Sequence, residues 1–223
     1  MENKNYGSFE DYEKSHCSLE TSLRTGLDEI VSFSGTYKNY CVCIVDVVNS
    51  TKITATLPRE KMCKYYSIFL NAMALIAKEF GASVVKIIGD SMLYYFPETS
   101  DVYKKLSFAD SLECGMAMID AHRIINTKMS EERLPHVDYR ISADYGSIMT
   151  AKSVTSLNDD VFGSSVNICA KINSLAESNG MVIGGDLYQI VKSFIGYDFK
   201  PVTDCSIGLK LQYPVYSITR HVE

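Results

Sequence analysis

A single carboxylate, Asp46, interrupts the apolar stretch Cys41 to Thr51, which reads CVCIVDVVNST. An unpaired charge among apolar neighbours is unfavourable, so this side chain needs a partner. A second acid, Asp90, follows Gly89 between the apolar runs ASVVKII and SMLYYF. If these segments are neighbouring strands, the two carboxylates face each other near the centre of the sheet and can hold hard divalent cations such as Mg²⁺ or Mn²⁺. Two structural roles stay open: Asp90 stabilises a turn, and Asp46 caps a strand end.

A polar stripe follows later, in the segment VFGSSVNICAKINSLA. Asn167 and Lys171 are four residues apart, so they share one face of the expected helix with Ser164 and Ser174. The other face is mostly apolar and carries Val166, Cys169, Ala170 and Asn173. The stripe is a candidate binding surface, and a solvent-facing lysine is the alternative for Lys171.

The elements that position these residues follow from hydrophobic periodicity. We expect helices over residues 8 to 34, from Pro58 to Gly81, over 106 to 128, over 161 to 176 and over 186 to 194. We expect strands over residues 40 to 48, 82 to 88, 91 to 96, 139 to 149, 181 to 185 and 213 to 218. Residues 1–37 would be an N-terminal helical extension, and residues 38–223 one α+β domain.

The length, charge and cysteine content of the chain exclude several classes of protein. The chain has 223 residues, 46% of them hydrophobic, which is enough for a full core in one domain. A formal charge of −5 gives no overall positive field for nucleic acid or anionic lipid. The seven cysteines show no zinc-finger spacing and are typical of reduced, buried thiols. Without a signal region or a membrane-spanning stretch, we expect a cytoplasmic protein with no nucleic-acid or membrane partner.

The order of five motifs resembles one known family, the catalytic domain of class III adenylyl and guanylyl cyclases. The motifs are VDVVNST, VVKIIGDSMLYYF, YRISADYG, DVFGSSVNICAKIN and LKLQYPVYSI, and the resemblance covers about residues 38 to 220. It implies a ferredoxin-like, palm-type antiparallel sheet flanked by helices. It also implies an enzyme that converts ATP to 3′,5′-cyclic AMP and pyrophosphate.

The resemblance assigns the metal and the reaction. Asp46 and Asp90 match the two metal-binding aspartates of the family, which hold two Mg²⁺ or Mn²⁺ ions per active site. These ions activate the ribose 3′-hydroxyl, which attacks the α-phosphate, and neutralise the triphosphate. Positioning and charge neutralisation carry such a reaction.

Lys86 and Asp160 match the residue pair that reads the base in adenylyl cyclases. Adenine N1 accepts a hydrogen bond, as from a lysine, and the exocyclic amine donates one, as to a carboxylate. Guanine presents the opposite pattern, so a guanylyl cyclase needs an acid where Lys86 stands. The resemblance therefore favours ATP, with a solvated strand lysine as the alternative for Lys86.

Asn167 matches the asparagine that positions the ribose, and Lys171 stands where the family has an arginine that stabilises phosphate charge. Lysine keeps the charge but lacks the planar fork that grips two phosphate oxygens. Three interpretations stay open: a slower cyclase, a catalytically silent nucleotide-binding regulator, and a cyclase for GTP or a pyrimidine nucleotide.

The remaining matches concern the triphosphate and the assembly. Arg140 matches an arginine of the family's motif before Gly146 and is expected to bind substrate, with a salt bridge at a strand edge as the alternative. Lys210 matches the lysine of the C-terminal motif that contacts the terminal phosphates. The turn that comprises Val47, Val48, Asn49, Ser50 and Thr51 replaces the usual Gly-Phe-Thr, and its backbone N–H groups would still cradle phosphate. Because the family builds each active site from two chains, with the metal-binding acids from one and the base and ribose contacts from the other, the resemblance implies a homodimer.

One further motif is set aside. GGDLY, at residues 184 to 188, is similar to the signature of diguanylate cyclases, in which it forms a hairpin. Here LYQIVKSF continues as an expected helix, so Gly184 and Gly185 are expected only to join a strand to that helix.

Overall fold

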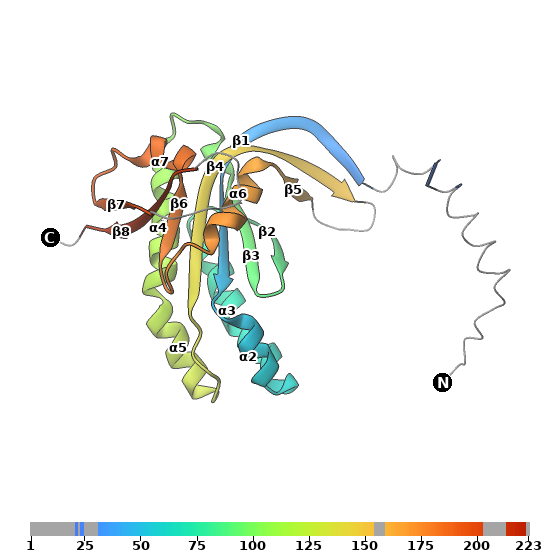
Figure 1. Cartoon of the computed structure of the whole chain (residues 1–223), viewed down its shortest axis with the longest axis vertical. Helices are drawn as coiled ribbons and strands as arrows, with labels where there is room; N and C mark the ends of the chain where they lie inside the picture. Colours follow the sequence, from blue (N-terminus) through green and yellow to red (C-terminus); the bar gives the residue numbers. More distant parts are fainter. Residues whose placement is uncertain (1–20, 22, 25–30, 154–158, 203–212, 222–223) are drawn as a thin grey trace.

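A mixed β-sheet forms the centre of the computed structural model, which describes residues 21, 23–24, 31–153, 159–202 and 213–221 (Figure 1). The strand order is β2-β3-β1-β4-β6-β8-β7, and β5 pairs with β4. The strands are β1 (Val31–Val47), β2 (Ser83–Ile88), β3 (Ser91–Phe96), β4 (Tyr139–Ser153), β5 (Asp160–Phe162), β6 (Met181–Gly184), β7 (Tyr197–Pro201) and β8 (Val215–Arg220).

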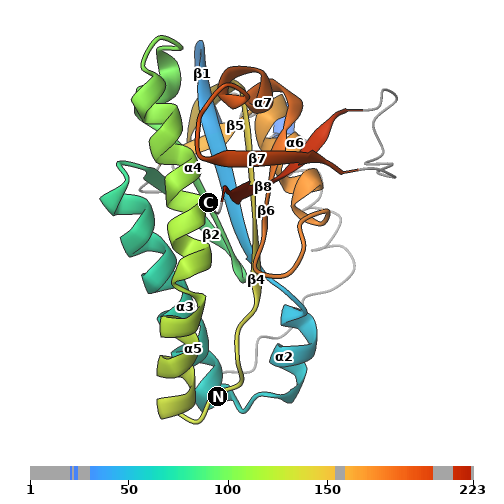
Figure 2. The same cartoon turned by 90° about the vertical axis from the view of Figure 1, so that its left-hand side faces the viewer.

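Helices cover both faces of this sheet. They are α2 (Ser50–Thr56), α3 (Arg59–Glu79), α4 (Lys105–Asp120), α5 (His122–Glu131), α6 (Ser164–Asn173) and α7 (Gly185–Val191), with a 3-10 turn η1 (Pro97–Ser100). Figure 2 shows α3, α4 and α5 on one side of the sheet and α6 on the other. No described helix is long and apolar enough to span a membrane.

Strand β1 is the central strand that its sequence predicts. Cys41, Val42, Cys43 and Val45 are all fully buried, so both faces of the strand are covered. It pairs antiparallel with β3 on one side and with β4 on the other. This pairing places Asp46 near the end of an interior strand.

The predicted leading helix over residues 8 to 34 is wrong for its last four residues. Residues 31–34 belong to β1, whose exposed first half continues the pairing with the end of β4. Backbone hydrogen bonds to β4 override the helical spacing of the apolar residues here. Of the preceding residues only Thr21, Leu23 and Arg24 are described, and they are helical.

Helix α3 and the β2–β3 hairpin match their predictions. Tyr65, Phe69 and Met73 recur every fourth residue and are fully buried. Gly81 has φ +76°, a left-handed conformation that favours glycine and ends the helix. Gly89 has φ +63° in the hairpin turn that carries Asp90.

Other elements differ in detail. The helix expected over residues 106 to 128 is divided into α4 and α5 at Ala121, which itself keeps helical dihedral angles. The sheet contains one parallel pair, β4 with β6. Residues 161–162, expected to begin the third helix, belong instead to β5, because they pair with Thr150 and Met149 of β4. Cys63 is exposed, unlike the other free cysteines among the described residues.

Gly184 and Gly185 join β6 to α7, as expected of a simple connection. The sequence GGDLY therefore forms no hairpin here.

Candidate functional site

Asp46 has two polar partners on the neighbouring strands. Ser91 on β3 donates its hydroxyl to Asp46 Oδ1 at 2.5 Å, and Arg140 on β4 places Nη2 3.3 Å from Oδ2. Both partners are the register neighbours of Asp46 in the sheet. The charge that looks isolated in the sequence is therefore compensated across two strands.

Asp90 lies in the turn between β2 and β3, immediately before Ser91. Since Ser91 pairs with Asp46, the turn brings the two acids to the same end of β1 and β3. This is the end of the strands rather than the centre of the sheet, which corrects the expected position.

One buried phenol interacts electrostatically with Asp90. Tyr65 on α3 is fully buried, and its hydroxyl has no hydrogen-bond partner among the described residues. Burial raises its pKa, and the neighbouring Tyr66, Asp138 and Asp90 raise it further, in that order.

The chemistry of the donors fits a hard divalent cation. Carboxylate oxygens are ligands that Mg²⁺ and Mn²⁺ prefer. The described residues contain no cluster of three or more His, Cys, Asp or Glu side chains that could hold a metal. A cation at Asp46 and Asp90 would thus need further oxygen ligands from backbone, amide, water or substrate.

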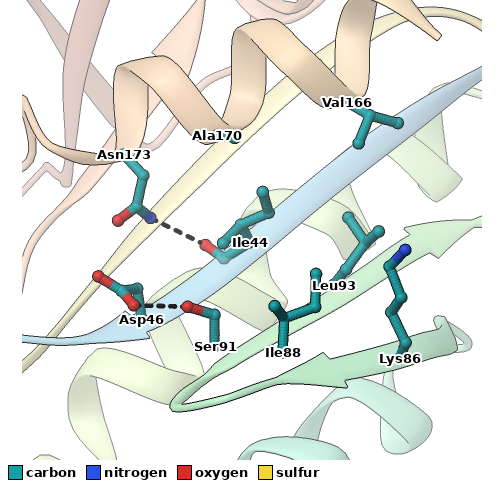
Figure 3. A pocket seen from close by; sticks show the side chains of 9 residues that line it. All are labelled: Ile44, Asp46, Lys86, Ile88, Ser91, Leu93, Val166, Ala170 and Asn173. Carbon is teal, nitrogen blue, oxygen red and sulfur yellow. Dashed lines mark hydrogen bonds between the residues drawn. The ribbon is translucent and has the colours of Figure 1, made fainter. Parts of the chain in front are cut away.

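A pocket of about 300 Å³ opens beside Asp46 (Figure 3). Asp46 and Ser91 lie at one end and Lys86 at the other. The walls between these ends are mostly apolar and come from β1, the β2–β3 hairpin and α6: Ile44, Ile88, Leu93, Val166, Ala170 and Asn173. Apolar walls with a few polar groups are typical of a ligand site.

Lys86 and Asp160 are in direct contact. Lys86 Nζ on β2 lies 2.5 Å from Asp160 Oδ2 on β5, and the two side chains remain 39% and 34% exposed. Each side chain can therefore still reach a ligand. The structure brings this sequence-predicted pair together.

Asn167 and Lys171 lie on a different face of α6 from the pocket. Both are exposed, whereas Val166, Ala170 and Asn173 line the pocket (Figure 3). Positions four apart share a helix face, so the stripe predicted from spacing is present. Within one chain, the structure does not bring Asn167 and Lys171 into the pocket that Asp46 and Lys86 line.

The turn after β1 offers fewer free N–H groups than expected. Val47 ends β1, and the N–H of Val48 donates to the carbonyl of Asp138 at 2.8 Å. Asn49 is the N-cap of α2 with φ +57°. Ser50 and Thr51 open the helix, where N–H groups have no intrahelical acceptor. Lys210 lies outside the described residues.

Sequence reasoning missed two polar residues at the pocket, Ser91 and Asn173. The spacing of Val166, Ala170 and Asn173 gave the available signal, since positions four and three apart form one helix face. An asparagine in that otherwise small, apolar row marks a polar point on the face that packs on the sheet.

Comparison with known families adds independent information. The family model described as the adenylate and guanylate cyclase catalytic domain matches residues 33–219 of this chain. An adenylate cyclase of Streptomyces griseus is 25% identical over 144 residues, covering 65% of this chain and 30% of that protein. A germination-specific adenylate cyclase of Dictyostelium discoideum is 24% identical over 197 residues, covering 85% of this chain and 21% of that protein. The chain thus spans less than a third of either relative.

Solved structures show the same fold. The adenylyl cyclase CyaB from P. aeruginosa superposes with a TM-score of 0.75 at 18% identity, covering 84% of this chain and 96% of that one. The guanylyl cyclase Cya2 superposes with a TM-score of 0.73 at 18% identity, covering 85% and 95%. The expected α+β fold, with helices flanking the sheet, is confirmed. The chain belongs to the adenylate and guanylate cyclase catalytic-domain family.

Proposed function

We propose that this domain converts ATP to 3′,5′-cyclic AMP and pyrophosphate. The observation that carries the choice of ATP is the contact between Lys86 Nζ and Asp160 Oδ2. An ammonium donor next to a carboxylate acceptor complements adenine, which presents N1 as acceptor and its amine as donor. Lys86 would donate to N1, and Asp160 would accept from the amine.

Asp46 and Asp90 hold the Mg²⁺ or Mn²⁺ ions, two per active site, in this proposal. When bound, the ions supply charge for the triphosphate and lower the pKa of the ribose 3′-hydroxyl. Arg140, whose Nη2 lies 3.3 Å from Asp46 Oδ2, is proposed to contact the phosphates. Lys210 is proposed for the terminal phosphates, and the N–H groups of the turn over residues 47–51 for the others.

The active enzyme is proposed to be a homodimer. Asn167 and Lys171 are exposed on α6, outside the pocket that Asp46 lines. These two residues would therefore complete the active site of a second copy, with Asn167 on the ribose and Lys171 on the reacting phosphate. One solved relative is described as a non-canonical dimer and two as monomeric, and others are described as complexes with GTP or with ATPalphaS.

The lysine at position 171, where the family has an arginine, supports a second candidate function, a catalytically silent nucleotide-binding regulator. A lysine lacks the bidentate geometry that an arginine offers to two phosphate oxygens, so the reacting phosphate is held less firmly. Guanylyl cyclases among the structural relatives keep GTP open as a substrate.

Incubation with each of the four ribonucleoside triphosphates and Mn²⁺, followed by mass spectrometry of the products, tests the proposal. Cyclic AMP that disappears in Asp46→Ala is expected. Nucleotide binding without any cyclic product would favour the regulator. Cyclic product from another nucleotide alone would overturn the assignment of Lys86 and Asp160.

A further inference from the structure

Asn173 is a buried amide at the last turn of α6, with only 5% of its surface exposed. Its Nδ2 lies near three acceptors: the carbonyl of Ile44 at 3.3 Å, the carbonyl of Arg140 at 3.5 Å and Ser142 Oγ at 3.2 Å. The side chain thus ties α6 to both strands that carry the Asp46–Arg140 pair.

This environment fixes which way the amide faces. Carbonyl oxygens only accept hydrogen bonds, so the nitrogen must face Ile44 and Arg140. The oxygen then turns into the pocket, on the side of the Asp46 carboxylate (Figure 3). The hydrogen bonds of Asn173 within the described residues all use Nδ2, so its oxygen is available to water or to a ligand in the pocket.

The free oxygen selects what can bind beside it. Asn173 Oδ1 is not among the buried side-chain atoms that lack a partner, so it is open to the pocket, and the neighbouring Asp46 is a second acceptor there. An anionic group would be repelled by both oxygens, whereas a cation with its bound water would satisfy both. The described residues supply too few acidic side chains to complete such a cation site.

We propose that Asn173 is a positioning residue of the cation site: its Oδ1 accepts a hydrogen bond from water held by a divalent cation at Asp46. This inference rests on the proposed function of Asp46. The inference adds a neutral oxygen of the same chain to the surroundings of the cation. Asn173 lies on the side of α6 that lines the pocket, whereas Asn167 and Lys171 are exposed. Asn173 therefore connects the cation end of the pocket to the helix proposed to serve a second copy.

Mn²⁺ binding without nucleotide tests this role, with free Mn²⁺ measured by electron paramagnetic resonance. Asn173→Ala should weaken binding by about 2- to 10-fold, the value of one ordinary hydrogen bond. Ser142→Ala is the matched control, because it removes one anchoring acceptor of Asn173 and leaves the amide oxygen in place. It should change the Mn²⁺ dissociation constant by less than about 2-fold on the same scale.

The thermal unfolding temperature of each variant shows how much the substitution destabilises the fold. A loss of Mn²⁺ affinity can then be distinguished from a loss of the contacts between α6 and the sheet. The inference is overturned if Asn173→Ala binds Mn²⁺ as tightly as the wild type. It is also overturned if Ser142→Ala and Asn173→Ala lose the same Mn²⁺ affinity and the same thermal stability. Asp46→Ala should abolish binding in the same assay. If Asp46→Ala kept wild-type affinity, the proposed cation site itself would be wrong, and the role of Asn173 with it.

Discussion

Lys86 Nζ and Asp160 Oδ2 lie 2.5 Å apart, although 74 residues separate them in the chain. Along the sheet, β3, β1 and β4 lie between β2, which carries Lys86, and β5, which carries Asp160, yet β2 and β5 also contact each other directly. The pair is partly exposed at the pocket end opposite Asp46. A donor and an acceptor are thus presented together to any base that enters.

Lys86→Met should reduce kcat/KM for ATP by about 10- to 100-fold, since a hydrogen bond from a charged donor is lost. The value for GTP should fall much less, because guanine offers a donor rather than an acceptor at N1. Parallel assays with both nucleotides measure this ratio. Equal losses for ATP and GTP would remove Lys86 from base recognition.

Arg140→Gln should tighten Mn²⁺ binding in the absence of nucleotide, by about 3- to 10-fold. The guanidinium lies 3.3 Å from Asp46 Oδ2 and repels a second cation there. ATP affinity should decrease in the same variant, because a phosphate partner is lost. Calorimetric titration measures both. Unchanged Mn²⁺ affinity would mean that Arg140 moves away from Asp46 before the cation binds.

Lys171→Arg should raise kcat for cyclic AMP formation by about 10-fold or more, because a planar guanidinium can hold two phosphate oxygens. Lys78→Arg is a matched control, since Lys78 is an exposed helix lysine on α3, on the other side of the sheet. It should leave kcat unchanged. If Lys171→Arg also had no effect, Lys171 would not contact the reacting phosphate.

Asp144 is a fully buried acid on β4 that lies outside the pocket. Tyr213 donates its hydroxyl to the carboxylate, with distances of 3.0 and 2.9 Å to the two oxygens. Burial raises the pKa of Asp144 to about 7, and the nearby charge of Asp186 raises it further, against the hydrogen bonds from Tyr145, Tyr213 and Leu187. The folded protein therefore keeps this proton to higher pH than the unfolded chain.

Stability should consequently fall as pH rises from about 4 to about 7, by up to about 1.4 kcal/mol per pH unit, and level off above. Asp144→Asn should remove this slope, whatever its absolute stability. Urea unfolding of both proteins at pH 5, 6, 7 and 8 gives the comparison. Parallel pH profiles for wild type and variant would show that Asp144 does not titrate in this range.

The fold was largely predictable because its strongest signals are local. The four-residue spacing of Tyr65, Phe69 and Met73 predicted α3, and Gly89-Asp90 predicted the hairpin turn. The extension of β1 to Val31 was not predictable, because it depends on pairing with residues more than a hundred positions later in β4. The same holds for β5.

The site divides in the same way. The type and spacing of Asp46, Asp90 and Lys86 were visible in the sequence, and the structure places them around one hairpin. Ser91 and Asn173 were missed, because serine and asparagine are common on surfaces and only burial distinguishes these two. Arg140 as the ion-pair partner of Asp46 follows from strand register, which the sequence does not fix.

Mixing two inactive variants tests the two-chain cyclase site most directly. Asp46→Ala would remove the cation-binding residue from each active site. The double variant Asn167→Ala, Lys171→Ala would remove the residues that α6 is proposed to contribute to the site of the other copy. Each variant alone should form almost no cyclic AMP from ATP. In an equal mixture of exchanging homodimers, half of the dimers carry one intact site, so about a quarter of wild-type activity should return. Dimers that exchange subunits yet form no cyclic AMP would contradict the account, as would full activity of either variant alone.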